Sequence, residues 1–129
     1  MSIPAGTAYV GIIRLAVASL ARTAGFDEER VDDIRIAVSE ACTNAVLAHE
    51  EAGADQPIKV AWTEAADRVI VQVEDRVGAR GADGVSPQDS QGFSTRMVMS
   101  VALLQEMADD LTIEPSESGG TTSRLTFSR

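Results

Sequence analysis

A glutamate and an asparagine stand four residues apart in a largely apolar stretch, and these two side chains could do chemistry together. They are Glu40 and Asn44, within the segment SEACTNA. At about 100° per residue, a helix places them about 40° apart, beside its apolar stripe rather than opposite it. A half-buried carboxylate there can accept a proton, and an amide oxygen can help hold a hard cation such as Mg²⁺. The alternative is an ordinary helix-surface pair in which Asn44 bonds to Glu40.

The helix that carries this pair has clear signals at both ends. Asp27 can cap its first turn, and Glu28 and Glu29 complement the positive end of its dipole. Polar residues 50–56 close it. Its predicted core stripe consists of Val31, Ile34, Val38, Ala41 and Ala45. We therefore expect Glu40 and Asn44 to flank a groove beside a buried helix face.

A second helix is predicted before this one, and a hairpin after it. Residues 10–22 are nearly all apolar, so we expect a helix that is buried over most of its circumference and ends near Gly25. Apolar residues alternate with polar neighbours in two runs joined by residues 65–67, which predicts a hairpin. These alternating residues are Ile58, Val60 and Trp62, then Val69, Val71 and Val73.

The last third of the chain is predicted to hold a long loop, a helix and a second hairpin. Residues 76–91 are rich in Gly, Ala, Asp, Ser and Pro, and loops of that length are usually functional or disordered. A third helix starts at about Ser94, which can act as its N-cap. The second hairpin places Leu111 and Ile113 against Leu125 and Phe127 around the turn at residues 119–120.

The order helix, helix, hairpin, long loop, helix, hairpin predicts an α+β fold. We expect a two-layer sandwich: a mixed, mainly antiparallel sheet with about three helices on one face. The length of 129 residues fits one domain, residues 1–129, and the chain contains no repeats.

Charge and cysteine content narrow the classes of function. The chain has 11 basic and 20 acidic residues and a net charge of -9, which counts against direct binding to nucleic acid or an anionic membrane and favours a protein partner. No apolar run reaches the length of a membrane span. The single cysteine, Cys42, in an apolar context, and the lack of a secretory leader predict a cytoplasmic protein.

Four blocks of the sequence resemble a known family. DIRIAVSEACTNAV, residues 33–46, is similar to the N-box of the anti-sigma-factor serine kinases, a branch of the GHKL ATPase superfamily with the Bergerat fold. The resemblance continues through VIVQVED, which ends at Asp75, GFSTRMVMSVAL, which starts at Gly92, and GGTTSRLTF, residues 119–127. The blocks follow the family's order over nearly the whole chain.

The resemblance implies a role for each matching residue. Glu40 would be the general base for a serine hydroxyl on a partner protein, and Asn44 would hold Mg²⁺ on the phosphates of ATP. Asp75 would accept the adenine amino group, and Thr121, in the GT pair with Gly120, would support that aspartate from the neighbouring strand.

The long loop would form a lid that closes over the phosphates at the amino end of the third helix, near Gly92, Ser94 and Thr95. Here the chain departs from the family. The usual D-x-G-x-G becomes DRVGA, residues 75–79, where Val77 and Ala79 replace the two glycines unless the alignment slips by one toward Gly78. In the lid, G-x-G-L becomes GFST, residues 92–95, which loses its second glycine at Ser94.

Three functions follow as alternatives. The first is an active serine kinase that holds a sigma factor and phosphorylates an anti-sigma antagonist with Mg-ATP. The second is a non-catalytic module that binds a sigma factor or an antagonist through the same fold, with an eroded nucleotide site. The third, a stand-alone histidine-kinase-like ATPase domain, is disfavoured because His49 is the one histidine and no phosphoacceptor helix pair precedes the domain. The resemblance also implies a homodimer formed partly by the sheet edge and the first helix.

Several further residues receive simpler interpretations. Arg14 matches a partner-contacting arginine of the family, and with Ala18 and Arg22 it is predicted to form a narrow basic stripe. His49 is predicted to be solvated at the end of its helix, near the negative end of the dipole. Cys42 is predicted to lie in the core. Met97, Met99 and Met107 are at helical spacing and are expected to pack.

Overall fold

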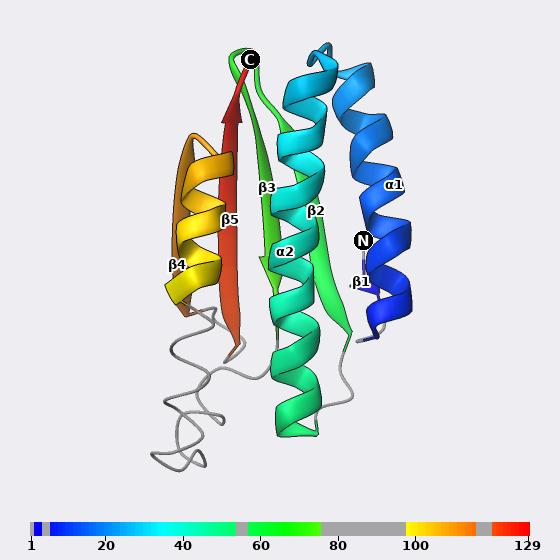
Figure 1. The fold of residues 1–129 in the computed structure, drawn as a ribbon, viewed down its shortest axis with the longest axis vertical. Coiled ribbons are helices and arrows are strands. Elements are labelled where there is room, and N and C mark those ends of the chain that lie inside the picture. The colour runs from blue at the N-terminus through cyan, green and yellow to red at the C-terminus, as the bar shows by residue number, and fades with distance from the viewer. Residues whose placement is uncertain (1, 4–5, 54–56, 76–97, 116–119) are drawn as a thin grey trace.

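The computed structural model describes residues 2–3, 6–53, 57–75, 98–115 and 120–129 (Figure 1). Its elements are β1 (Ser2–Ile3), α1 (Thr7–Thr23), α2 (Glu28–Ala52), β2 (Ile58–Glu64), β3 (Arg68–Glu74), β4 (Asp110–Pro115) and β5 (Thr121–Ser128). Residues 98–107 are also helical. Each helix and hairpin that the sequence predicts is therefore present, while the predicted long loop lies outside the described residues.

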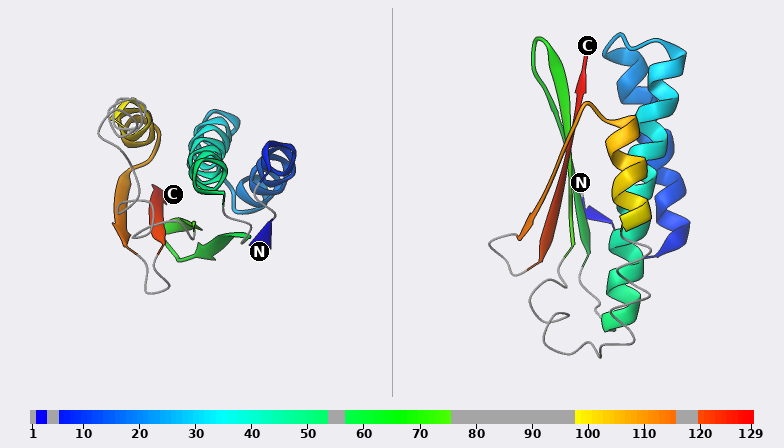
Figure 2. Two further views of the ribbon diagram at one scale, coloured as in Figure 1. Left: turned by 90° about the horizontal axis from the view of Figure 1, so that it is seen from below. Right: turned by 60° about the vertical axis from the view of Figure 1, so that its left-hand side comes forward.

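The described strands form one sheet in the order β1-β2-β3-β5-β4, and every described pair is antiparallel. The register places Val71 opposite Trp62 on one side and Leu125 on the other. Figure 2 shows α1, α2 and the helix of residues 98–107 on the same face of this sheet. The predicted two-layer α+β sandwich is confirmed.

The core lies between α2 and the central strands. The predicted stripe of α2 is buried, with Val31, Ile34 and Val38 fully covered. It packs against apolar strand residues, namely Ile58, Val60, Val69, Val71, Val73, Leu125 and Phe127. Burying such side chains contributes about 1.5–3 kcal/mol each, so this interface is the main source of stability.

Cys42 belongs to the same core, as predicted. Its side chain is fully buried, and that burial raises the pKa of the thiol to about 12. The cause is desolvation, which penalises the charged thiolate.

Both ends of α2 follow local rules. The Asp27 side chain accepts a hydrogen bond of 2.8 Å from the backbone N–H of Arg30, which confirms the predicted N-cap. At the other end Gly53 adopts a φ of 66°, a left-handed conformation that glycine allows at low cost. These caps stabilise the two ends of the helix that carries Glu40 and Asn44.

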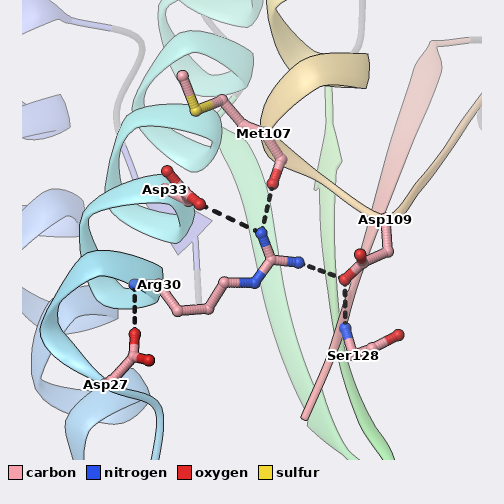
Figure 3. A network of polar contacts seen from close by, with 6 residues as sticks. All are labelled: Asp27, Arg30, Asp33, Met107, Asp109 and Ser128. Carbon is pink, nitrogen blue, oxygen red and sulfur yellow. Dashed lines mark hydrogen bonds and ion pairs between the residues drawn. The ribbon is translucent and has the colours of Figure 1, made fainter.

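Arg30 connects α2 to the segment around Met107 and Asp109 and, through Asp109, to β5 (Figure 3). Its Nη1 donates to Asp33 Oδ2 at 3.3 Å and to the carbonyl of Met107 at 2.9 Å, and its Nη2 donates to Asp109. Asp109 also accepts from the backbone N–H of Ser128 at 2.6 Å. One half-buried side chain therefore joins α2, the end of the helix of residues 98–107, and the end of β5.

The prediction that the first helix is buried over most of its circumference is wrong. One face is buried and carries Val10, Ile13, Val17, Ala18 and Ala21. The other face exposes Tyr9, Ile12, Leu15 and Leu20. Helix α1 lies at one side of the domain against α2, and no described element covers its outer face (Figure 2). An apolar run in a sequence shows that a helix is apolar, but it does not show how many neighbours the helix has.

Within the part of the chain that the structure describes, no helix has the length and apolar composition needed to cross a membrane.

Candidate functional site

Glu40 and Asn44 are both half-buried on α2, beside the core stripe as the sequence predicts. The side-chain nitrogen of Asn44 donates a hydrogen bond of 2.5 Å to the hydroxyl of Ser100. Ser100 lies in the helix of residues 98–107 and is buried. The Asn44 amide nitrogen is therefore directed to another helix and not to Glu40, so the simple surface pair is not what the structure contains.

In the orientation found in the structure, one end of the Asn44 amide is engaged and the other end is left for a cation. The nitrogen is used by Ser100, so the oxygen is the atom that could bind a hard ion. No group of three or more His, Cys, Asp or Glu side chains that could hold a metal occurs among the described residues. A Mg²⁺ at Asn44 would thus take most of its ligands from water and nucleotide phosphates, which is the usual habit of this ion. The residues present fit Mg-nucleotide.

Asp75 follows β3 directly and is held by the first residue of β5. The backbone N–H of Asp75 donates to the Thr121 carbonyl at 3.0 Å, and the backbone N–H of Thr121 donates to Asp75 Oδ1 at 3.2 Å. The predicted proximity of Thr121 is present, and the contact is a direct backbone one. A carboxylate offers about four lone-pair sites. Asp75 therefore retains the capacity to accept a bond from an exocyclic amine such as that of adenine.

These residues come from elements that meet at one end of the molecule. Figure 1 shows β3 ending and β5 beginning toward the end of the domain at which α2 terminates. Asp75 and Thr121 lie at that end of the sheet, and Asn44 lies in the second half of α2. Asn44 on α2 and the pair Asp75 and Thr121 on the sheet therefore lie on elements that approach the same end of the domain.

The remaining predicted site residues lie outside the described residues. They are Gly78, Gly92, Ser94 and Thr95. The same holds for Val77 and Ala79, at which the chain departs from the family's glycines.

Two hollows occur at the other end of the domain. One, of about 550 Å³, is lined by residues around the start of α2, including Asp27 and Arg30. The other, of about 400 Å³, lies over the sheet beside Arg68 and Arg124. Neither is lined by Glu40, Asn44 or Asp75, so the candidate site is defined by its side-chain chemistry and not by these hollows.

The predicted basic stripe on α1 is wrong. Ala18 is buried, and Arg22 bonds in a bidentate manner with Glu28 through Nε at 2.8 Å and Nη2 at 3.2 Å. This hydrogen bond and the positive charge of Arg22 lower the pKa of the Glu28 carboxyl. Arg14 is exposed and donates to the Ser39 hydroxyl at 2.9 Å. Arg14 is thus a single cation next to the residue that precedes Glu40, and not part of a stripe.

The solvated position predicted for His49 is also wrong. Its side chain is fully buried although it lies in the last turn of α2. The neighbouring Ala45 and Val46 are buried too, so the carboxyl-terminal turns of this helix are covered. Position near a helix end does not by itself indicate exposure.

The prediction that the methionines pack is confirmed for one residue and wrong for another. Met107 packs against the core as predicted, whereas Met99 is 71% exposed, so the packing prediction for Met99 is wrong. Met97 lies outside the described residues. Met99 is one residue away from the buried Ser100, and it falls on the outer face of its helix.

Comparison with known proteins agrees with this geometry. Residues 3–127 match the model of the histidine kinase-like ATPase domain. The chain belongs to this histidine kinase-like ATPase family. Two relatives are the serine-protein kinases RsbW of Bacillus licheniformis, 30% identical over 134 residues, and of Bacillus pumilus, 31% identical over 136 residues. In both cases the alignment covers 98% of this chain and 83% of the relative.

Two solved structures share the fold. The crystal structure of the RsbU and RsbW domains of a Mycobacterium tuberculosis protein has a TM-score of 0.73 and 25% identity, and covers 100% of this chain and 32% of that one. The SiaB–SiaC complex from Pseudomonas aeruginosa has a TM-score of 0.70 at 13% identity, and covers 98% of this chain and 87% of that one. The latter likeness concerns the fold alone.

Proposed function

We propose that this member of the histidine kinase-like ATPase family is an anti-sigma regulator of transcription. It binds a sigma factor, an anti-sigma antagonist, or both, and it phosphorylates a serine of the antagonist with Mg-ATP. The observation that carries the proposal is the placement of Glu40 and Asn44 on one helix with the Asn44 nitrogen held by Ser100. Relatives that are named serine-protein kinases support the same reading.

The proposed mechanism assigns one task to each residue. Glu40 is half-buried and would take the proton of the incoming serine hydroxyl, whose oxygen would receive the γ-phosphoryl group as ADP leaves. Asn44 would hold the cation through its amide oxygen, and Asp75 would hold the adenine end of the nucleotide. Bound Mg-ATP supplies the phosphoryl group and the cation that neutralises its charge. Phosphoryl transfer depends mainly on positioning and charge neutralisation, so few protein groups are needed.

The partner surface is proposed to include Arg14 and the exposed face of α1. Arg14 is exposed on an acidic protein, and its contact with Ser39 leaves several of the five guanidinium donors available. The apolar residues Ile12 and Leu15 are 57% and 75% exposed on the same helix. A homodimer that buries part of this face belongs to the same proposal.

A second candidate is a non-catalytic protein-binding module on the same fold. It is favoured by Val77, Ala79 and Ser94, which stand where the family has glycines. A β-branched residue resists the left-handed backbone and the close approach that glycine allows. This module would bind its partner without transferring phosphate.

The test separates the two candidates. Wild-type protein and Glu40→Gln are incubated with radiolabelled [γ-³²P]ATP, Mg²⁺ and an extract of the source cells, and labelled proteins are identified by mass spectrometry. The kinase proposal predicts phosphoserine on a protein with wild type and at least a hundredfold less with Glu40→Gln, in line with the roughly 10²–10⁴-fold contribution of a general base. If wild type transfers no label to any protein, the kinase proposal fails and the non-catalytic binding module remains.

A further inference from the structure

Ser100 occupies an unusual position for a polar residue. Two polar side chains are buried among the described residues, Ser100 and His49. Ser100 is 3% exposed and lies on the helix of residues 98–107, which contributes Leu104 and Ala108 to the core. Buried polar groups are retained where they have a partner, because an unpartnered one is costly. The partner of the Ser100 hydroxyl is the side chain of Asn44.

The contact with Ser100 matters because the two ends of the Asn44 amide differ in their chemistry. A carboxamide has a donor end and an acceptor end of nearly equal size, and rotation about its last torsion exchanges them. A donor end facing a cation would be repulsive, whereas the oxygen is a good ligand. In the structure the nitrogen donates to the Ser100 hydroxyl, so the nitrogen faces the helix of residues 98–107 and the oxygen faces away from it.

We propose that Ser100 is a positioning residue that holds the amide of Asn44 with its oxygen available to the nucleotide-bound cation. The inference rests on the proposed Mg-nucleotide function of Asn44 and deepens it. Ser100 itself does not touch the nucleotide; it acts through Asn44. The bond also joins α2 to the helix of residues 98–107, so a displacement of one helix changes the orientation of the cation ligand on the other.

The test compares nucleotide affinity with and without the cation. ATP binding is measured by calorimetry in Mg²⁺ and in EDTA for wild type, Ser100→Ala and Ser100→Thr. Ser100→Ala is expected to weaken binding about tenfold in Mg²⁺, at the upper end of the net contribution of one neutral hydrogen bond, and to leave binding in EDTA within about twofold. Ser100→Thr keeps the hydroxyl and is expected to restore Mg²⁺-dependent binding.

A matched control separates positioning from packing. Val101→Ala removes bulk from a half-buried neighbour on the same helix without removing the Asn44 partner. It should lower the melting temperature and leave the ratio of the two affinities unchanged. Equal loss of affinity in Mg²⁺ and EDTA for Ser100→Ala, or no loss in either, would overturn the positioning role. Wild-type protein that binds no nucleotide in either condition would instead refute the proposed function, and this inference with it.

A second readout needs no nucleotide. In the apo protein, the side-chain NH₂ group of Asn44 gives its own pair of NMR signals, and a hydrogen bond to Ser100 shifts them and slows their exchange with water. The signals should have these properties in wild type and Ser100→Thr and lose them in Ser100→Ala. Signals that do not change in Ser100→Ala would show that the contact is absent in solution and contradict the proposal.

Discussion

At the scale of single residues, Asp75 shows how backbone geometry can hold a binding group without side-chain help. Its Oδ1 accepts from the backbone N–H of Thr121, so the Thr121 hydroxyl is not needed for this bond. Asp75→Asn has the same shape and keeps an oxygen for Thr121, but it turns the other end of the group into a donor. A donor there opposes the adenine amino group.

We therefore predict that Asp75→Asn weakens ATP binding at least about tenfold, or 1.4 kcal/mol, while the melting temperature stays nearly unchanged. Calorimetry and thermal unfolding measure the two quantities. Thr121→Val is the matched control, because it keeps the backbone N–H and should keep the affinity within about twofold. If Thr121→Val is as harmful as Asp75→Asn, the hydroxyl and not the backbone holds the aspartate.

Cys42 gives a prediction for the pH dependence of stability. Burial raises its pKa to about 12 in the folded protein, from an ordinary value of 9.0. Between these values the unfolded chain loses the proton while the folded one keeps it, so the free energy of unfolding falls as pH rises above about 9, by up to 1.4 kcal/mol per pH unit. Below pH 9 the thiol is protonated in both the folded and the unfolded chain, so Cys42 causes no loss of stability there.

Urea unfolding of wild type and Cys42→Ala at pH 8, 9.5 and 10.5 checks this. The wild type should lose more stability over that range than Cys42→Ala, and the native thiol should resist alkylation at pH 8. Equal loss in the two proteins would show that the thiol is not protected by the fold.

The residues of the candidate site were predictable to different degrees. Glu40 and Asn44 could be found because helical spacing sets their relation within one element. Asp75 and Thr121 could be proposed through the family resemblance, and the structure shows that Asp75 follows β3 and bonds to Thr121, the first residue of the paired strand β5. Ser100 could not, since it meets Asn44 across 56 residues of sequence and no local pattern encodes a contact between two helices.

At the scale of elements, helix and strand boundaries were the most predictable feature, because caps and alternation are local. The neighbours of each helix were not. The outer face of α1 was expected to be covered and is exposed, and His49 was expected to be exposed and is covered. Both errors concern which elements pack together, a property of the fold and not of the segment.

The Arg30 network joins several elements of the described part of the chain through polar contacts. Its guanidinium meets Asp33, Asp109 and the Met107 carbonyl, and it lies 5.4 Å from the centre of the Phe127 ring. The side chain is 24% exposed, so these bonds are only partly screened by solvent.

We predict that Arg30→Ala lowers the free energy of unfolding by about 2 kcal/mol, which is typical for the loss of charged hydrogen bonds. Arg35→Ala is the matched control. Arg35 makes a single ion pair, with Asp32 on the same helix, and this pair is more exposed to solvent than the Arg30 network. Its loss should change stability by less than about 0.5 kcal/mol. Urea denaturation measures both. Similar losses for the two variants would show that the network adds nothing beyond a surface pair.

At the scale of the whole molecule, the exposed face of α1 is the feature with the clearest consequence. Leu15 is 75% exposed and Ile12 is 57% exposed, on a helix with no described neighbour on that side. Adjacent exposed apolar side chains of this kind mark interaction surfaces.

We predict that Leu15→Glu converts the proposed homodimer to a monomer and leaves the melting temperature of the monomer within a few degrees. Sedimentation at several concentrations measures the association. Ala66→Glu adds the same charge to the exposed turn between β2 and β3 and should leave the dimer intact. A wild-type protein that sediments as a monomer at all concentrations would contradict the homodimer and leave the face for another partner.

The central claim is that the fold holds a working Mg-nucleotide site, and calorimetric titration with ATP and ADP in Mg²⁺ tests it most directly. Wild type is compared with Asn44→Ala and Asp75→Asn. We predict micromolar binding to wild type, accompanied by a stability gain of roughly 2.7 kcal/mol at a hundredfold excess over Kd, and its loss in both variants. No binding to wild type at millimolar nucleotide would contradict the claim and leave a protein-binding module on an ATPase fold.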